Sequence, residues 1–171
     1  MFISGAQDAI GICTPSLSRH LYDSAYWPSK IEKCNNEEIL LWLEQHLCLI
    51  FIEARDENYS VFKNTDITSS KIKNLVDASE KCWNAIQKRD LEEFAKYFLA
   101  SFYSQTSMFP SMITPNVQKI IEKYSKLDDV LGWKLSGAGG GGYLICIVND
   151  IRTFSKRYED VIPITIKREV Y

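Results

Sequence analysis

The chain has 171 residues, of which 46% are hydrophobic and 25% are charged, and its formal net charge is −2. This size and composition predict one folded globular domain and exclude a disordered or collagen-like chain. The nearly balanced charge disfavours binding to nucleic acid through bulk positive charge, and the longest apolar run, residues 47–52, is far shorter than a membrane span of about 20 residues. We therefore expect neither nucleic acid nor a membrane as a partner.

The first third of the chain is predicted to hold a hairpin, a short helix and one central strand. Residues 4–12 have small side chains and fit a helical turn. Two strand-like runs, residues 17–22 and 29–33, are separated by turn-forming residues, which predicts the hairpin. Residues 37–44 fit the helix, and the continuous apolar run at 47–52 is typical of a central strand covered on both faces or by helices.

The middle of the chain is predicted to be helical. In residues 72–86 apolar side chains recur at steps of three and four, which predicts a long amphipathic helix. A group of hydroxyl side chains directly before this stripe could cap the start of the helix. Asp90 and Glu93 are typical of a capping box in its aspartate form, at the start of a second apolar stripe over residues 91–102. A third helix is predicted over residues 115–124, because a Thr-Pro pair marks its start.

The last third changes to strand patterning around a cluster of glycines. Residues 132–135 and 143–148 are predicted strands, and Asp150 is predicted to cap a short helix. Residues 161–166 are predicted to form a final strand at a sheet edge, because Pro163 has no N–H. Strands at both ends with helices between them predict an α+β domain with a mainly antiparallel sheet.

The five cysteines favour reduced, buried thiols over disulfides or metal ligands. Their number is odd, no Cys-x-x-Cys spacing occurs, and most lie among apolar neighbours. The two histidines, His20 and His46, are too far apart for a zinc-ligand motif, so no metal site is predicted. The N-terminus lacks the charged and apolar regions of a signal peptide, and the chain is predicted to be cytoplasmic.

The strongest functional signal is the run Lys134-Leu-Ser-Gly-Ala-Gly-Gly-Gly-Gly142, which holds five of the eight glycines. Glycine allows positive φ and lets successive backbone N–H groups form a concave surface that attracts phosphate. The alternative is a flexible linker or a wide hairpin, but polar spacers rather than apolar strands would flank a linker. The run is neither a Walker A loop nor a G-x-G-x-x-G dinucleotide fingerprint. Lys134 itself is expected to be solvated.

A second signal is the run Gly5-Ala-Gln-Asp8 near the N-terminus. A catalytic carboxylate and a turn or N-cap aspartate both fit it, and taken alone the structural role is favoured. Arg55 and Asp56 follow the apolar run at 47–52. These two residues could contact a substrate, or they could lie in a solvent-facing polar loop, and the sequence favours neither role.

Together and in this order, these segments resemble the GHMP kinases, the family of galactokinase, homoserine kinase, mevalonate kinase and phosphomevalonate kinase. The glycine cluster matches the family's third motif. Gly5-Ala-Gln-Asp8 resembles the second-motif region, most closely that of the galactokinase-like and heptose-kinase-like sugar kinases. The resemblance extends over residues 4–166 and implies a ferredoxin-like, two-layer α+β fold with a mainly antiparallel sheet and extra helices.

The resemblance implies an enzyme that transfers the γ-phosphate of ATP, with Mg²⁺, to a sugar hydroxyl. It implies that Asp8 is the base that accepts the proton of this hydroxyl. It also implies that one loop lines the phosphate end of the site, formed by Ser136, Gly137, Ala138, Gly139, Gly140, Gly141 and Gly142.

The chain lacks the family's first motif, Pro-x-x-x-Gly-Leu-x-Ser-Ser, which wraps the nucleotide phosphates. We therefore expect residues 1–171 to be a single C-terminal domain, with residues 1–16 as the remnant of a junction to a missing N-terminal nucleotide-binding domain. The chain alone is predicted to be inactive and to self-associate through the face that the missing domain would cover. Two alternatives are a non-catalytic ferredoxin-like ligand-binding module and a homo-oligomerisation domain.

Overall fold

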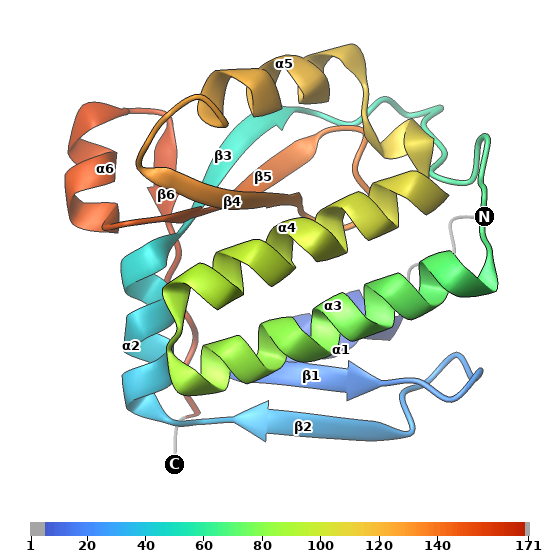
Figure 1. Ribbon diagram of the computed structural model, residues 1–171, viewed down its shortest axis with the longest axis horizontal. Helices are drawn as coiled ribbons and strands as arrows, with labels where there is room; N and C mark the ends of the chain where they lie inside the picture. The colour runs from blue at the N-terminus through green and yellow to red at the C-terminus, as the bar shows by residue number, and fades with distance from the viewer. Residues whose placement is uncertain (1–5, 170–171) are drawn as a thin grey trace.

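The computed structural model describes residues 6–169, apart from the side chain of Asp8. Figure 1 shows a larger sheet flanked by helices, and a separate hairpin. The larger sheet has four strands in the order β4-β5-β3-β6. In chain order the elements are α1 (Ala6–Cys13), β1 (Leu17–Leu21), β2 (Lys30–Cys34), α2 (Glu37–His46), β3 (Leu47–Glu53), α3 (Ser69–Lys88), α4 (Leu91–Met108), the 3₁₀ turn η1 (Pro110–Met112), α5 (Pro115–Tyr124), β4 (Val130–Leu135), β5 (Gly142–Val148), α6 (Ile151–Arg157) and β6 (Val161–Pro163).

The two inner strands of the larger sheet are β3 and β5, as their apolar runs predict. They are antiparallel, with Cys48 opposite Cys146 and Ile50 opposite Leu144, and these four side chains are fully buried. Every strand pair within residues 6–169 is antiparallel. The predicted α+β class is therefore confirmed.

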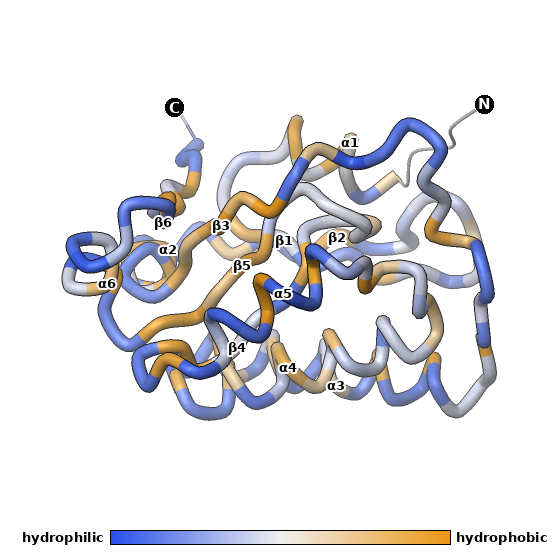
Figure 2. The backbone as a smooth tube through the Cα atoms, turned by 90° about the horizontal axis from the view of Figure 1, so that it is seen from above, coloured by the Kyte–Doolittle hydropathy of each residue, from blue (hydrophilic) through white to orange (hydrophobic). Residues whose placement is uncertain are grey.

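Helices cover both faces of this sheet. On one face Cys48 and Ile50 pack with Val117 of α5 and Phe154 of α6. On the other face Ile147 packs with residues of α2 and α4. Figure 1 shows α5 above the sheet and α4 along β4, and Figure 2 shows hydrophobic stretches along β3 and β5. The helices α2 and α4 thus add a partial second helical layer to the predicted two-layer arrangement.

Polar side chains cap the start of five helices: Asn36, Thr68, Asp90, Thr114 and Asp150 each accept a hydrogen bond from a backbone N–H of the first turn. Such caps satisfy N–H groups that have no partner inside the helix. The predicted helix starts are therefore confirmed. None of the helices within residues 6–169 is long and apolar enough to span a bilayer.

The capping box predicted at the start of α4 forms only in half. The carboxylate of Asp90 accepts from the N–H of Glu93 at 3.0 Å. The reciprocal bond is not made, because the Glu93 carboxylate pairs with Lys96 and the N–H of Asp90 donates to the carbonyl of Ala85. The Glu93 carboxylate and the Asp90 N–H thus each bond to another neighbour instead of to each other.

The last strand is shorter than predicted, because β6 ends at Pro163. Further along, the chain bonds to other elements: the N–H of Ile166 donates to Glu44 Oε1 at 2.6 Å, and the carbonyl of Lys167 accepts from the N–H of Ser16 at 2.7 Å. These tertiary contacts replace the sheet ladder. The predicted edge position is confirmed, since β6 lies at the end of the strand order.

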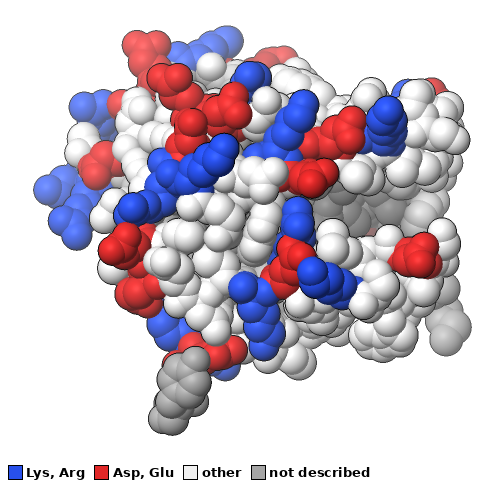
Figure 3. Space-filling view, turned by 60° about the horizontal axis from the view of Figure 1, so that its bottom comes forward, with Lys and Arg blue, Asp and Glu red and all other residues white. Residues whose placement is uncertain are grey.

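The predicted hairpin is formed by β1 and β2. An ion pair between Arg19 and Glu32 joins the two strands across the ladder. Figure 3 brings the hairpin side forward and shows acidic and basic side chains interspersed with uncharged surface. At the turn, the rings of Tyr26 and Trp27 stack edge to face and are both exposed.

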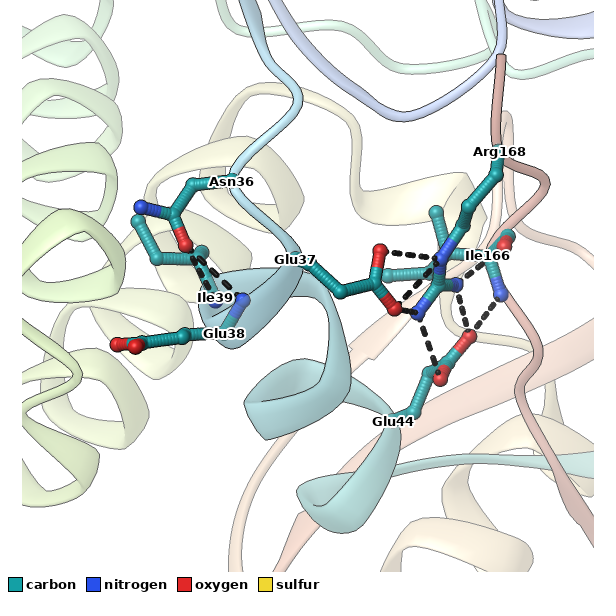
Figure 4. A network of polar contacts seen from close by, with 7 residues as sticks. All are labelled: Asn36, Glu37, Glu38, Ile39, Glu44, Ile166 and Arg168. Atoms are coloured by element: carbon teal, nitrogen blue, oxygen red, sulfur yellow. Dashed lines mark hydrogen bonds and ion pairs between the residues drawn. The ribbon is translucent and has the colours of Figure 1, made fainter. Parts of the chain in front are cut away.

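A polar network joins α2 to the segment after β6 (Figure 4). The guanidinium of Arg168 donates to the carboxylates of both Glu37 and Glu44. Hydrogen bonds from Arg168 hold the pKa of each carboxyl below its usual value, and the two carboxylates raise the pKa of the guanidinium. The network therefore favours the charged forms and fastens the segment to α2.

Replacing Arg168 by alanine is expected to lower the melting temperature at pH 7 by about 2–4 °C, because two carboxylates lose their shared donor. The carboxyl pKa values are lowered in the folded protein, so this stabilisation is present above the unfolded-state pKa and is lost as the pH falls through the folded-state pKa. The difference between wild type and variant should therefore shrink towards about pH 3. Thermal denaturation at several pH values measures it.

The matched control for this prediction is Arg152→Ala, at an exposed position on α6. A melting-temperature difference for Arg168→Ala that persists at low pH would contradict the assignment to the two carboxylates. An equal loss in the control variant would show that the effect comes from net charge alone.

Candidate functional site

The glycine loop, defined as residues 136–142, connects β4 to β5. All five of its glycines have positive φ, between 67° and 140°. Residues with a Cβ strongly disfavour this left-handed region, and the requirement is strictest at Gly139 and Gly140, which are also buried. Ser136 and Gly137 are exposed. The start of the loop thus faces solvent while its middle is packed.

Close packing adds a second reason for glycine in the middle of the loop. A Cβ at Gly139 would lie 2.8 Å from Cβ of Met112, and a Cβ at Gly140 would lie 2.2 Å from Cε2 of Tyr59. Both distances are shorter than non-bonded carbon atoms tolerate. The glycine loop is therefore a packed turn that joins the antiparallel strands β4 and β5, so the flexible-linker alternative is wrong and the wide-hairpin alternative describes the geometry.

The backbone polar groups of the glycine loop divide into two sets. Tyr59 Oη donates to the carbonyl of Ala138 at 2.7 Å, Arg55 Nε donates to the carbonyl of Gly139 at 2.9 Å, and the N–H of Gly140 donates to the carbonyl of Met112 at 3.0 Å. Three successive N–H groups have no protein acceptor within residues 6–169, those of Gly137, Ala138 and Gly139. Successive free N–H groups beside left-handed residues form a concavity that binds anions.

Residues 84–159 match the family model described as GHMP kinases C terminal. The matched segment runs from within α3 to just beyond α6 and contains the glycine loop. The fold is that of a GHMP kinase C-terminal domain. No curated protein matches the sequence.

Several solved structures share this fold at low sequence identity. Galactokinase from Lactococcus lactis, in complex with galactose, is 16% identical over 77% of this chain and 43% of its own, with a TM-score of 0.56. Mevalonate diphosphate decarboxylase from Enterococcus faecalis is 14% identical over 84% and 49%, with a TM-score of 0.55. A D-glycero-D-manno-heptose 1-phosphate kinase from Bacteriodes thetaiotaomicron is 13% identical over 83% and 42%, with a TM-score of 0.51. The chain therefore spans less than half the length of each of these relatives.

In this GHMP kinase C-terminal fold, Arg55 lies at an exposed position after β3 and bonds to the glycine loop. Its Nε is bonded to Gly139, and its guanidinium lies 5.6 Å from the centre of the Tyr59 ring. Asp56 has a local role, because its carboxylate accepts from the N–H of Asn58 at 2.7 Å. Both residues lie at exposed positions, as the solvent-facing interpretation predicts, and their contact with a substrate stays a prediction.

Tyr59 is the residue that sequence reasoning missed. Burial raises the pKa of its hydroxyl above the ordinary value, with the nearby Arg55 guanidinium acting in the opposite direction. The hydroxyl is therefore protonated at neutral pH and can donate to Ala138. A tyrosine in a polar segment after a strand gives no local sign of a contact 79 residues away.

Lys134 is largely buried, so the expectation of a solvated strand lysine is wrong. Its Nζ donates to Ser101 Oγ of α4 at 3.1 Å, and no carboxylate within residues 6–169 lies at ion-pair distance. Burial lowers the pKa of Lys134 and raises that of the nearby Cys82 thiol to about 11. Packing of β4 against α4, where a Cβ at Gly132 would lie 3.0 Å from the carbonyl of Ala95, encloses this side chain.

Asp8 lies in α1, and its side chain falls outside the described part of the structure. Its assignment as the catalytic base stays a prediction. The run Gly5-Ala-Gln-Asp8 begins outside the described residues as well, so the relation of this motif to the glycine loop rests on the sequence resemblance.

The acidic, cysteine and histidine side chains are the candidate metal ligands of this chain. Within residues 6–169 no three or more of them are grouped so that they could hold a metal ion. All five cysteines are free; Cys34, Cys48 and Cys146 are buried, whereas Cys13 is exposed, contrary to expectation.

Proposed function

We propose that this domain is the C-terminal part of an ATP-dependent GHMP kinase and that its glycine loop lines the phosphate end of the nucleotide site. The observation that supports this most is the row of three N–H groups, at Gly137, Ala138 and Gly139, without a protein acceptor in the described part of the chain. Left-handed glycines hold these groups in a packed turn. Partial positive charge fixed in this way suits phosphate oxygens.

In phosphoryl transfer the protein mainly positions the reacting groups and stabilises charge. The glycine loop would stabilise negative charge at the phosphate end of ATP. Asp8 would accept the proton of the attacking hydroxyl late in the reaction, once bonding to phosphorus has made that proton acidic. One solved structure with the same fold is that of MDDEF in complex with MVAPP, AMPPCP and magnesium. For this enzyme we propose ATP and Mg²⁺, with magnesium ligands from outside the described residues.

We propose a sugar hydroxyl as the acceptor. The support is the likeness of Gly5-Ala-Gln-Asp8 to the sugar-kinase branch of the family. The shared fold does not choose between acceptors, because galactokinase, a heptose kinase and mevalonate diphosphate decarboxylase all match it. The sugar proposal therefore rests on the sequence resemblance and not on the fold, and it needs a direct test with candidate substrates.

We further propose that the domain acts together with an N-terminal nucleotide-binding domain. The absence of the first motif from these 171 residues and the coverage of less than half of the solved relatives support this. The chain alone should then show no measurable kinase activity, since ATP would be held on one side only.

The test is phosphate transfer from ATP by the two domains together, offered galactose, a heptose phosphate and mevalonate diphosphate in separate reactions. Turnover of a sugar is the expected result. Turnover of mevalonate diphosphate alone would replace the sugar proposal. Robust activity of the 171 residues by themselves would overturn the two-domain proposal, and binding without turnover by the two domains would favour the non-catalytic module.

Self-association is proposed through exposed apolar surface near the glycine loop. Phe51 and Tyr143 lie opposite each other on β3 and β5, stack edge to face at 5.5 Å, and are 52% and 37% exposed. Large contiguous apolar patches mark sites of association, and this pair would form part of one. We expect Phe51→Ser to shift the isolated chain towards monomer in sedimentation velocity, with Phe62→Ser as the control for loss of an exposed phenylalanine elsewhere. Equal sedimentation of both variants and wild type would contradict this proposal.

A further inference from the structure

Two side chains of the segment after β3, Arg55 and Tyr59, bond to neighbouring carbonyls of the glycine loop. We propose that they are positioning residues, which fix the direction of the free N–H groups and so shape the anion site without contacting the anion. This inference rests on the proposed phosphate-binding role of the loop. It adds a function for residues that lie 79 and 84 positions away from the loop in the sequence.

The Tyr59 hydroxyl fixes the orientation of the peptide unit between Ala138 and Gly139. A peptide unit is planar and trans, so its carbonyl and its N–H point in opposite directions. The Tyr59 hydroxyl holds the Ala138 carbonyl at 2.7 Å, and this directs the N–H of Gly139 away from the tyrosine. That N–H is one of the three without a protein acceptor in the described residues.

The next peptide unit, between Gly139 and Gly140, is held at both of its polar ends. Its carbonyl accepts from Arg55 Nε at 2.9 Å, and its N–H donates to the carbonyl of Met112 at 3.0 Å. Residues before and after the helical pair α3–α4 thus hold this unit from two sides. The Gly139–Gly140 peptide unit cannot rotate without breaking two hydrogen bonds, and this restrains the adjoining Ala138–Gly139 unit, which carries the free N–H.

Packing makes the arrangement rigid. The Tyr59 ring occupies the space where a Cβ of Gly140 would lie, and the Arg55 guanidinium packs on that ring. A loop whose N–H groups already point towards the ligand has little ordering to undergo when an anion binds. Loss of either contact should therefore weaken anion binding even though neither side chain touches the anion.

The experiment is a titration of the 171-residue chain with inorganic triphosphate, followed through the backbone ¹⁵N–¹H resonances of the glycine loop. Tyr59→Phe removes the hydroxyl and keeps the ring. Arg55→Lys keeps the charge and removes the Nε–H donor. We expect each variant to bind triphosphate about three- to tenfold more weakly than the wild type, with the melting temperature nearly unchanged. The controls are Tyr22→Phe and Arg152→Lys, at exposed positions with the same chemical changes.

The outcomes separate this inference from the proposed function. Equal triphosphate affinity in wild type, Tyr59→Phe and Arg55→Lys would overturn the positioning role and leave the phosphate site standing. If triphosphate does not shift the wild-type loop resonances, the phosphate site fails. The positioning role is then decided by the ligand-free backbone order parameter of Gly139: a fall in Tyr59→Phe supports it, and no change overturns it.

Discussion

A Gly139→Val or Gly141→Val variant is expected to bind nucleotide about tenfold or more weakly in the two-domain enzyme and to be less stable by about 2–5 kcal/mol. Gly139 has φ of 70° and its Cβ would meet Met112; Gly141 has φ of 140° and its Cβ would lie 3.1 Å from the carbonyl of Glu53. A β-branched residue resists both conformations. Isothermal titration with ATP and thermal denaturation measure the two effects.

The glycines of this chain supply matched controls. Gly137 also has positive φ, but a Cβ there would meet no atom within 4 Å, so Gly137→Ala tests backbone strain without overlap. Gly11, in α1, has neither positive φ nor a close neighbour, and Gly11→Ala should be harmless. Unchanged ATP affinity and turnover in both valine variants would count decisively against a phosphate-site role for the loop.

Asp8→Asn is expected to reduce turnover by about 10²-fold or more in the two-domain enzyme while sugar and ATP affinity are kept. Asparagine has nearly the size of aspartate and retains an acceptor oxygen, but it cannot take up the hydroxyl proton. A purely structural turn or N-cap role would tolerate the substitution, because asparagine is an equally good cap. Steady-state kinetics with separate binding measurements therefore distinguishes the two roles.

Asp56→Asn is the matched control, since its carboxylate accepts a local backbone hydrogen bond that asparagine can also accept. Normal turnover of Asp8→Asn would end its assignment as the base. A comparable loss in Asp56→Asn would show that any carboxylate near the loop matters through charge alone, and not through proton transfer by Asp8.

The features predicted correctly from the sequence depend mostly on local interactions. The cap at Thr114 and the cap at Asp150 bond to N–H groups three residues away, so their signal is complete within one turn of chain. The inner strand β3 was recognised from its unbroken apolar run. The glycine run could be assigned to a turn with positive φ because other residues rarely adopt that conformation.

What could not be predicted depends on contacts between distant residues. The Tyr59 hydroxyl meets Ala138, and the Lys134 ammonium meets Ser101, only after the sheet has paired and α4 has packed along β4. The shortened β6 has the same origin, since Glu44 and Ser16 supply the hydrogen bonds that a longer strand would have made. The apolar pattern of a strand does not indicate which distant residues will be its hydrogen-bond partners.

The segment after β6 also determines when the domain can be completed during folding. Ile166 and Arg168 bond to Glu44 at sequence separations of 122 and 124, and Lys167 bonds to Ser16. Closing loops of this length costs chain entropy before any contact is gained, and contacts of high sequence separation slow folding. The bonds to Glu44 and Ser16 therefore need residues that come last in the domain, and we expect them to form late in folding.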